Sequence, residues 1–337
     1  MRPALPVCIL APFLIAAGPS QAIQWRLDVV DAPGRVDAVE ASGGTVRVNA
    51  GGLRYRLTLD GDKPVFTFID ALPKPERPPG ALPDGHIATG AHDIKRVWLA
   101  EPTPRYDHGV LGDKIEAGSL VIEPRDGAPQ TVRLKPDAVF EDLRPRIADL
   151  DGDGHDEIVV VKSYLKRGSA LAVIAARKGH YSIVAETQPL GAPHRWFDPV
   201  GIADFNGDGK MDIALVRQPH VVGMLELWTW NDGKLQKTDE IGDASNHIAG
   251  TRAIDMSAVA DFNGDGIADI AIPSLDRKRL RLVSFAPKAH EFAVLALPAA
   301  ATTDIAVVSK KDNAPAIALG LANGRLALMQ RVPPPAP

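Results

Sequence analysis

The sequence contains very little cysteine and few aromatic residues. Its 337 residues include a single cysteine, Cys8, and aromatic side chains make up 5% of the total. A single cysteine cannot build an internal disulfide framework or a cysteine-based zinc site. The net charge is -4, and no basic block large enough to bind nucleic acid is present. The composition therefore argues against a disulfide scaffold and predicts that nucleic acid is not a partner.

Long apolar runs are also missing beyond the N-terminus. After residue 22, no segment reaches the roughly 18 apolar residues that a membrane-spanning helix requires. Residues 1–22 combine a positive start at Arg2, an apolar stretch over residues 4–17, and small residues at Ser20 and Ala22. This pattern predicts a secretory signal peptide that is removed after Ala22. We therefore expect an exported protein, periplasmic or extracellular, with no membrane span.

Turn-forming residues are abundant, with 30 glycines and 29 prolines, and hydrophobic residues make up 45% of the chain. This apolar content is sufficient for a packed core. No stretch shows a convincing helical apolar stripe. Short apolar runs rich in β-branched residues alternate with turn signals, which predicts an all-β fold.

Three segments align without gaps and define a repeat. They read IADLDGDGHDEI (147–158), IADFNGDGKMDI (202–213) and VADFNGDGIADI (259–270), so that their first aspartates are 55 and 57 residues apart. Each period holds four short strand-like runs. A regular period of this length indicates an array of supersecondary units, and four strands per unit is typical of a β-propeller blade.

Strand-like runs without the acidic loop flank these repeats. The last unit, at 305–308, 316–319 and 326–329, has only three, and we expect residues 25–30 to supply its fourth. Pairing the two chain ends would close the ring and remove an open sheet edge. The sequence thus predicts a propeller over residues 23–332, of six blades with seven as the alternative. Within it we expect a solvated Pro-rich connector at 73–85, and a Pro-rich tail follows at 333–337.

The acidic loops carry the clearest chemistry. Oxygen side chains recur at positions 1, 3, 5 and 9, and glycines at positions 4 and 6 permit the tight winding that brings them together. Position 7 varies, as expected if it contributes a backbone carbonyl. Several flexible oxygen ligands suit Ca²⁺, and we expect about three ions. The expected ligands are Asp149, Asp151, Asp153, His155 and Glu157 in the first loop; Asp204, Asn206, Asp208, Lys210 and Asp212 in the second; and Asp261, Asn263, Asp265, Ile267 and Asp269 in the third.

Two other interpretations of these loops were weighed. An EF-hand requires a glutamate at position 12 and flanking helices, but position 12 is Val160, Leu215 or Ile272 within a predicted strand, so we reject it. Solvated Asp-Gly turns without metal are the second alternative. In the first loop, Asp156 and Glu157 both stand where the other loops have one acid, and which of them binds metal is open.

The DLDGDG and DFNGDG loops between two strands resemble the FG-GAP or VCBS repeats of integrin α-subunit-type β-propellers. The resemblance covers residues 140–300. It implies structural calcium in the loop between the first and second strands of three blades, held by the residues given above. The family includes adhesion, ligand-binding and a few catalytic proteins, so the resemblance does not fix a function.

A second group of polar residues precedes the predicted innermost strands. Two repeats share an Arg-x-x-Asp pattern with histidine nearby, and a polar Gly-rich loop at 105–113 could approach the same place. We expect these residues at the propeller face opposite the calcium loops, near the central channel, where they could hold an anionic or sugar ligand. Arg–Asp pairs that align neighbouring blades are the alternative. The candidates are Arg105, His108, His194, Arg195, Asp198, His247, Arg252 and Asp255.

No hydrolase, metalloprotease or phosphate-loop motif occurs, and no residue is assigned a catalytic role. The sequence predicts an exported calcium-binding propeller that acts as a protein- or glycan-binding module. One alternative is a polysaccharide lyase or hydrolase with its active site on the channel face. Another is a structural scaffold of an envelope assembly. Convergence of His108, His194 and His247 on one cleft is required by the enzyme hypothesis, because catalytic groups must reach one substrate atom.

Overall fold

Short strands connected by glycine turns build the chain throughout its described part. The computed structural model describes residues 24–42, 44–69, 77–231, 233–310 and 315–332. Every regular element in these ranges is a β-strand, as the all-β prediction requires. The expected signal peptide and C-terminal tail lie outside the described residues. No helix in the described part of the chain is long and apolar enough to cross a membrane.

Four sheets each contain four antiparallel strands. The first comprises β2 (Val36–Ser42), β3 (Thr45–Ala50), β4 (Leu53–Asp60) and β5 (Lys63–Phe68). Two further sheets comprise β14 (Phe197–Ala203), β15 (Asp212–Arg217), β16 (Met224–Asn231) and β17 (Lys234–Ile241), and then β18 (Ala258–Ala260), β19 (Asp269–Pro273), β20 (Arg279–Ser284) and β21 (His290–Ala296). The fourth comprises β22 (Ala301–Val308), β23 (Ala316–Leu321), β24 (Leu326–Arg331) and β1 (Trp25–Val30).

The fourth sheet takes its outer strand from the other end of the chain. Strand β1 pairs antiparallel with β24, from Trp25 opposite Arg331 to Val30 opposite Leu326. The expectation that residues 25–30 complete the last unit is therefore confirmed. This pairing covers the edge that β24 would otherwise expose.

The remaining eight strands form one curled sheet rather than two separate ones. They are β6 (Ile94–Thr103), β7 (Glu116–Pro124), β8 (Gln130–Arg133), β9 (Ala138–Phe140), β10 (Arg146–Ala148), β11 (Glu157–Tyr164), β12 (Gly168–Arg177) and β13 (His180–Glu186). The short strand β9 pairs with both β7 and β11, and so joins two groups of strands. The count of six blades stays a prediction, because the pairing of this sheet does not divide it into blades.

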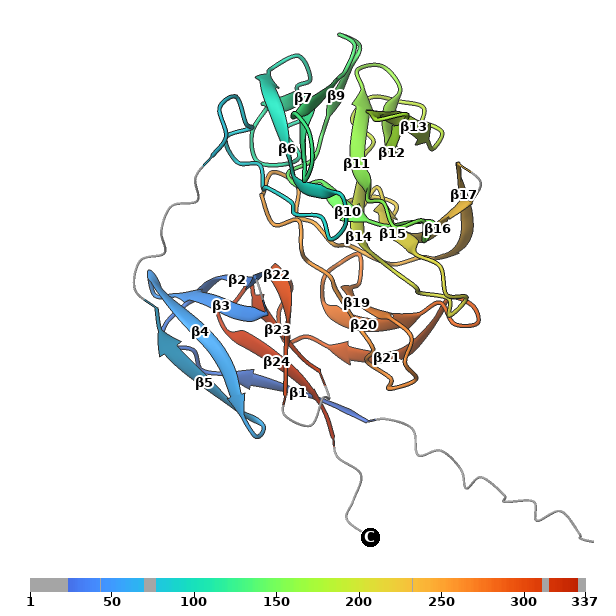
Figure 1. The fold of residues 1–337 in the computed structure, drawn as a ribbon. Coiled ribbons are helices and arrows are strands. Elements are labelled where there is room, and N and C mark those ends of the chain that lie inside the picture. Colours follow the sequence, from blue (N-terminus) through green and yellow to red (C-terminus); the bar gives the residue numbers. More distant parts are fainter. Residues whose placement is uncertain (1–23, 43, 70–76, 232, 311–314, 333–337) are drawn as a thin grey trace, which may run out of the picture.

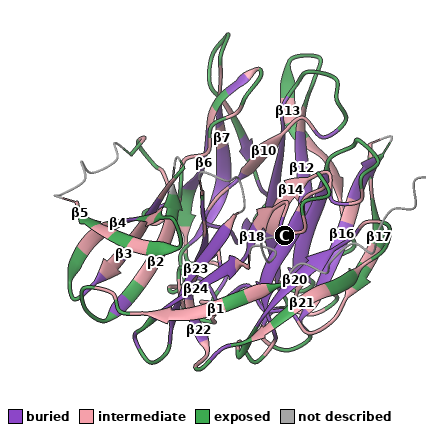
Figure 2. Ribbon diagram, turned by 90° about the horizontal axis from the view of Figure 1, so that it is seen from below, coloured by how far each residue is buried: buried purple, intermediate pink, exposed green. Residues whose placement is uncertain are grey.

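The sheets are arranged around a common centre, as in a propeller (Figure 1). The first strands of successive sheets are neighbours: β2 lies beside β22, β22 beside β18, β18 beside β14, and β14 beside β10. Second strands such as β15 and β19 are almost wholly buried, whereas outer strands such as β17 and β21 are largely exposed (Figure 2). This radial order places the connections that enter each first strand near the common centre of the sheets.

The Pro-rich connector differs from expectation in its described part. Leu82 is only 1% exposed, and its amide donates to the Leu99 carbonyl of β6 at 2.8 Å. The expectation that residues 73–85 are solvated is wrong at this point. The reason is that an apolar residue between the prolines adds a short bridging segment to the edge of β6 and enters the core.

The acidic loops and a histidine face

The first aspartate of each acidic loop accepts backbone amides from the loop itself. Asp204 Oδ1 accepts from the amides of Gly207 at 2.7 Å and Asp208 at 3.2 Å, and its Oδ2 accepts from Gly209 at 2.9 Å. Asp149 and Asp261 make the same three bonds. Glycines at positions 4 and 6 adopt positive φ in all three loops, which only glycine does without strain. The backbone therefore winds tightly around the first carboxylate.

This winding brings acidic oxygens together. Carboxylate oxygens of Asp149, Asp151 and Asp153 lie within 4.8 Å of one another. Charges of one sign at this separation repel strongly unless a cation lies between them. Carboxylate, amide and carbonyl oxygens are the ligands that Ca²⁺ prefers, so the residues present fit this ion. In the second and third loops, the equivalent positions hold Asp, Asn and Asp.

Position 9 is buried and closes the loop. Asp269 accepts the amide of Phe262 at 3.0 Å, and Glu157 accepts the amide of Leu150 at 2.9 Å. Asp156 instead turns to the neighbouring strands, where its Oδ2 accepts the amides of His92 and Ile94. Glu157 is therefore the structural counterpart of Asp269. Burial raises the pKa of Glu157 to about 7, and the loop aspartates add to this shift.

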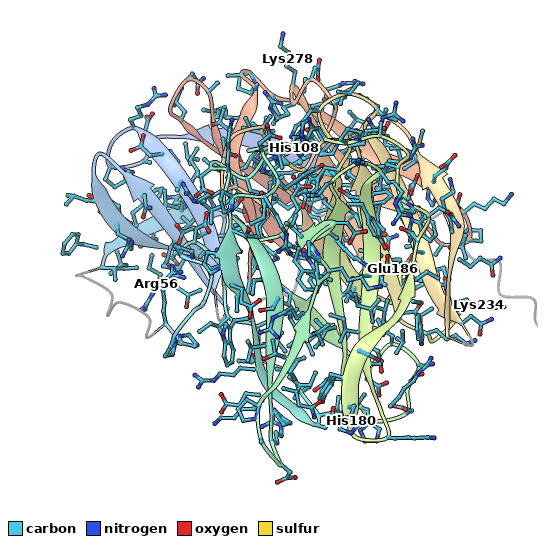
Figure 3. The ribbon with its side chains drawn as sticks, turned by 90° about the horizontal axis from the view of Figure 1, so that it is seen from above. Arg56, His108, His180, Glu186, Lys234 and Lys278 are labelled. Atoms are coloured by element: carbon cyan, nitrogen blue, oxygen red, sulfur yellow. The ribbon has the colours of Figure 1, made fainter. Side chains whose placement is uncertain are left out.

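The second group of candidates gathers at the other end of the sheets. Successive strands of an antiparallel sheet reverse direction, so connections after the first and second strands leave from opposite ends. The acidic loops follow the first strands of their units, which are β10, β14 and β18. The histidines lie on other connections: His108 on β6–β7, His194 on β13–β14, His220 on β15–β16 and His247 on β17–β18. Figure 3 shows His108 and Lys278 at one end of the molecule and His180, from the β12–β13 turn, at the other.

Two histidines stack on this face. The rings of His108 and His194 are 5.0 Å apart with an interplanar angle of 17°. His108 Nδ1 lies 2.6 Å from Glu141 Oε1, and His194 Nε2 lies 3.1 Å from Asp107 Oδ1. Glu141 is fully buried, while the His194 side chain is 48% exposed. A carboxylate thus orients each ring, and within the described part of the chain the other nitrogen of each ring makes no hydrogen bond.

Two further histidines form a hydrogen-bonded chain beside them. His247 Nε2 lies 3.1 Å from the Thr251 carbonyl, which can only accept. His247 therefore donates through Nε2, and its Nδ1 accepts from His220 Nε2 at 3.0 Å. His220 therefore carries its proton on Nε2, and its Nδ1 keeps a lone pair that can accept a hydrogen bond. Burial lowers the pKa of His220 to about 4 and that of His247 to about 3, so both rings are neutral at neutral pH.

Trp196 connects the two histidine pairs. Its ring is 5.0 Å from His247 and 6.3 Å from His220, and its Nε1 donates to the Glu141 carbonyl at 3.0 Å. The charge of His108 also lowers the pKa of both His220 and His247. The structure therefore brings His108, His194 and His247 to one face. We call Tyr106, His108, His194, Trp196, His220 and His247 the histidine face.

The other candidates serve as connections between segments. Arg105 donates to the Ala138 carbonyl through two nitrogens, and Arg195 donates to the Leu190 carbonyl. Arg252 pairs with Asp84 and Asp113 of the Pro-rich connector and the β6–β7 connection.

The two aspartates of the Arg-x-x-Asp pattern lie deeper. Asp255 pairs with Arg144. Asp198 is 1% exposed, and neither of its carboxylate oxygens has a hydrogen-bond partner among the described residues. The arginine and aspartate of each pattern do not pair with one another. The bonds of Arg252 and Asp255 agree with the alternative of ion pairs between sheets.

Sequence reasoning missed Glu141, His220 and Tyr106 as site residues. Tyr106 is buried and its hydroxyl accepts the His194 amide at 2.8 Å. Glu141 follows the three-residue strand β9, and His220 has no counterpart in the other repeats. Neither stands in a motif. Only the Tyr-Asp-His run at 106–108 carried a signal that could have suggested a ring near His194.

Comparison with known proteins identifies the repeats. The FG-GAP-like repeat family matches residues 149–215 and 204–272, so the chain carries FG-GAP-like repeats, as the acidic loops predicted. No curated protein sequence matches the chain.

Three solved structures are similar in overall form. Rhamnogalacturonan lyase YesW is 15% identical with a TM-score of 0.44, over 88% of this chain and 60% of the lyase chain. BBS1N, solved in complex with ARL6DN, is 15% identical with a TM-score of 0.44, over 92% and 87% of the two chains. The N-terminal domain of Nup159 is 13% identical with a TM-score of 0.39, over 89% and 76%.

Proposed function

We propose that this chain is an exported, calcium-binding β-propeller that binds a protein or glycan ligand through its histidine face. The observation that carries the proposal is the stacked pair of His108 and His194. In this pair the partly exposed His194 ring lies over the His108 ring, which Glu141 orients. Aromatic and imidazole rings with free polar edges are suited to hold a ligand by stacking and hydrogen bonding together.

Calcium has a structural role in this proposal. The loops that would hold the ions lie at the opposite end of the sheets from the histidine face. An ion held there would join the first and second strands of a unit and would not contact the ligand. Export is proposed from the pattern of residues 1–22. Calcium is abundant outside the cytosol, where extracellular modules bind it with modest affinity.

The test is a glycan array and a partner-binding assay with the mature chain, residues 23–337, and a His108→Ala/His194→Ala variant. We expect the bound ligand to be lost in the double variant, while the melting temperature stays within a few degrees of the wild type. A His180→Ala variant is the matched control, because this exposed ring lies at the other end of the molecule. A ligand that binds the double variant unchanged would remove the histidine face from the proposal.

An enzyme is the second candidate, and the His108–Glu141 contact favours it. A carboxylate that holds one imidazole nitrogen leaves the other available as a general base. Such a base could remove a proton beside the carboxyl group of an acidic glycan, as a polysaccharide lyase requires. The assay is formation of an unsaturated product from polygalacturonate, followed by ultraviolet absorbance. Glu141→Gln should lower the rate of product formation. If the wild type forms no product, the enzyme candidate is rejected for this substrate and the binding role is the one that remains.

A further inference from the structure

Within the described part of the chain, one face of the first sheet is not covered by a neighbouring sheet. Along β3, buried Val46, Val48 and Ala50 alternate with the partly exposed Thr45, Arg47 and Asn49. The corresponding strands β19 and β23 are buried at every position. A strand packed on both faces reads as a continuous apolar run, whereas alternation marks a strand packed on one face. The buried face of this sheet meets β22–β24.

The uncovered face carries three arginines. Arg47 lies directly opposite Arg56 in the β3–β4 ladder. Arg54 stands two residues before Arg56 on β4, and its side chain is on the same face of the sheet. Like charges directly opposite each other in a sheet are destabilising. We call Arg47, Arg54 and Arg56 the arginine row.

The sheet supplies little compensating acid. Within the described residues, Arg56 makes no hydrogen bond or ion pair, and Arg54 donates only to Asn49 Oδ1 at 3.3 Å. Arg47 has Glu40 at 3.9 Å, a long separation for an ion pair, and its buried Nε has no hydrogen-bond partner. The row therefore leaves guanidinium donors available that are suited to bind carboxylates in a bidentate manner.

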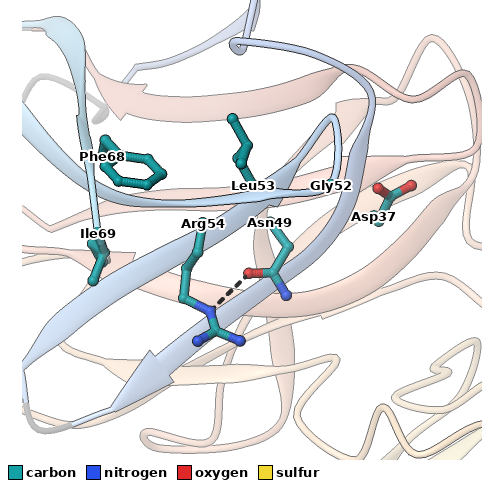
Figure 4. A pocket seen from close by; sticks show the side chains of 7 residues that line it. All are labelled: Asp37, Asn49, Gly52, Leu53, Arg54, Phe68 and Ile69. Carbon is teal, nitrogen blue, oxygen red and sulfur yellow. Dashed lines mark hydrogen bonds between the residues drawn. The ribbon is translucent and has the colours of Figure 1, made fainter. Parts of the chain in front are cut away.

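A pocket of about 480 Å³ adjoins one end of the row (Figure 4). Arg54 and Asn49 line it from the arginine side of the sheet. Leu53 and Phe68, which are 51% and 58% exposed, line it from the other face. Its single acidic lining residue, Asp37, lies 3.7 Å from Arg35. This volume lies within the range of small-ligand sites, roughly 300–1,000 Å³.

We propose that the arginine row and this pocket bind an acidic glycan, with sugar carboxylates on the guanidinium groups and one sugar unit in the pocket. The arginine side of the sheet offers arginines, Asn49 and threonines, whereas the exposed Leu53 and Phe68 lie on its other face. The row itself therefore lacks the aromatic anchor that is typical of a stable protein interface. A linear chain of acidic sugars would match a row that extends across strands. This site is separate from the histidine face in Figure 3, where Arg56 lies far from His108, and does not depend on the proposed function.

The test is isothermal titration calorimetry of the mature chain with polygalacturonate, at low and at physiological salt, with calcium present. Polyglutamate serves as an acidic polymer without sugar, and a neutral glucan as a sugar without charge. The variants are Arg56→Gln, which breaks no hydrogen bond or ion pair within the described residues, and Arg54→Gln/Arg56→Gln. Arg133→Gln is the control, because it removes an exposed arginine, paired with Glu101, from another sheet.

We expect polygalacturonate to bind, the double variant to bind about tenfold or more weakly, and the control to bind within about twofold of the wild type. Salt should weaken binding, because the charges are exposed. Equal binding by the double variant and the wild type would overturn the proposal, and so would tighter binding of polyglutamate. Loss of binding in the His108→Ala/His194→Ala variant alone would place the glycan on the histidine face and overturn this site without affecting the proposed function.

Discussion

Arg144 and Asp255 form a bidentate ion pair between segments that are 111 residues apart in the chain, with nitrogen–oxygen distances of 3.0 and 2.5 Å. Arg144 stands between β9 and β10 of the curled sheet, and Asp255 precedes β18. The amide of Asp255 in turn donates to Asp304 Oδ1 of β22 at 3.0 Å. Three sheets are thus tied together near their common centre by polar contacts as well as by apolar packing.

Breaking this ion pair should destabilise the fold. Arg144→Gln is expected to lower the free energy of unfolding by about 1–3 kcal/mol, because it leaves the Asp255 carboxylate beside Asp304 without its cation. Urea unfolding measures the change. The control is Arg325→Gln, which removes an exposed pair with Asp31 and should cost about 0.5 kcal/mol or less. A cost as small as in the control would show that the pair does not hold the sheets together.

Asp304 should make stability fall as the pH rises. Burial, aided by the Asp255 charge, raises the pKa of Asp304 to about 7 from an ordinary value near 4. Between these pH values the folded state holds a proton that the unfolded state has released, so the free energy of unfolding decreases with rising pH. Asp304→Asn should therefore stabilise the protein most above pH 7, by on the order of 2 kcal/mol, and the gain should vanish near pH 4. A gain independent of pH in urea titrations would contradict this assignment.

His247 should have the opposite pH dependence. Burial lowers its pKa from 6.5 to about 3, so between these values the unfolded state binds a proton that the folded state does not. The free energy of unfolding should then rise with pH over this window. His247→Gln should reduce this slope. Urea unfolding at several pH values gives the slope of the free energy of unfolding against pH for each variant. His290→Gln is the control, because His290 is exposed, and it should leave this slope unchanged.

Asp151 separates metal binding from loop folding. Its side chain makes no hydrogen bond within the described residues, whereas Asp149 accepts three backbone amides. Calcium at a hundredfold excess over its dissociation constant should add about 2.7 kcal/mol per site. Asp151→Asn should raise the melting temperature in chelator slightly, because it removes one of three mutually repelling carboxylates, and should reduce the rise on adding calcium. No rise with calcium in the wild type would identify the loops as metal-free turns.

The repeat made much of the fold predictable. Each acidic loop places two glycines between two apolar runs, and this local pattern sets both a turn and the start of the buried strand after it. The runs at 158–161, 213–216 and 270–272 all lie within strands of the structure. The last unit shows only three strand-like runs after residue 300, and this deficit of one strand was enough to predict the pairing of β1 with β24, because an open propeller edge requires a partner.

The parts that could not be predicted depend on contacts distant in sequence. Strand β9, with only three residues, is too short to show an alternating pattern, yet it joins two groups of strands. Glu141 contacts His108 of the histidine face only because the short strand β9, which precedes it, lies beside β11. Arg144 and Asp255 stand in no common motif, and their pairing follows from the closed arrangement of the sheets.

The pairing of β1 with β24 also has a consequence for biosynthesis. The first strand of the described chain must wait for roughly 300 residues to be made before its partner exists, which takes about 15–60 s at ordinary rates of synthesis. During that time β1 has no edge to join, and the last sheet is incomplete. A nascent chain that stops before residue 326 would keep both edges open and would be prone to aggregate or to be degraded.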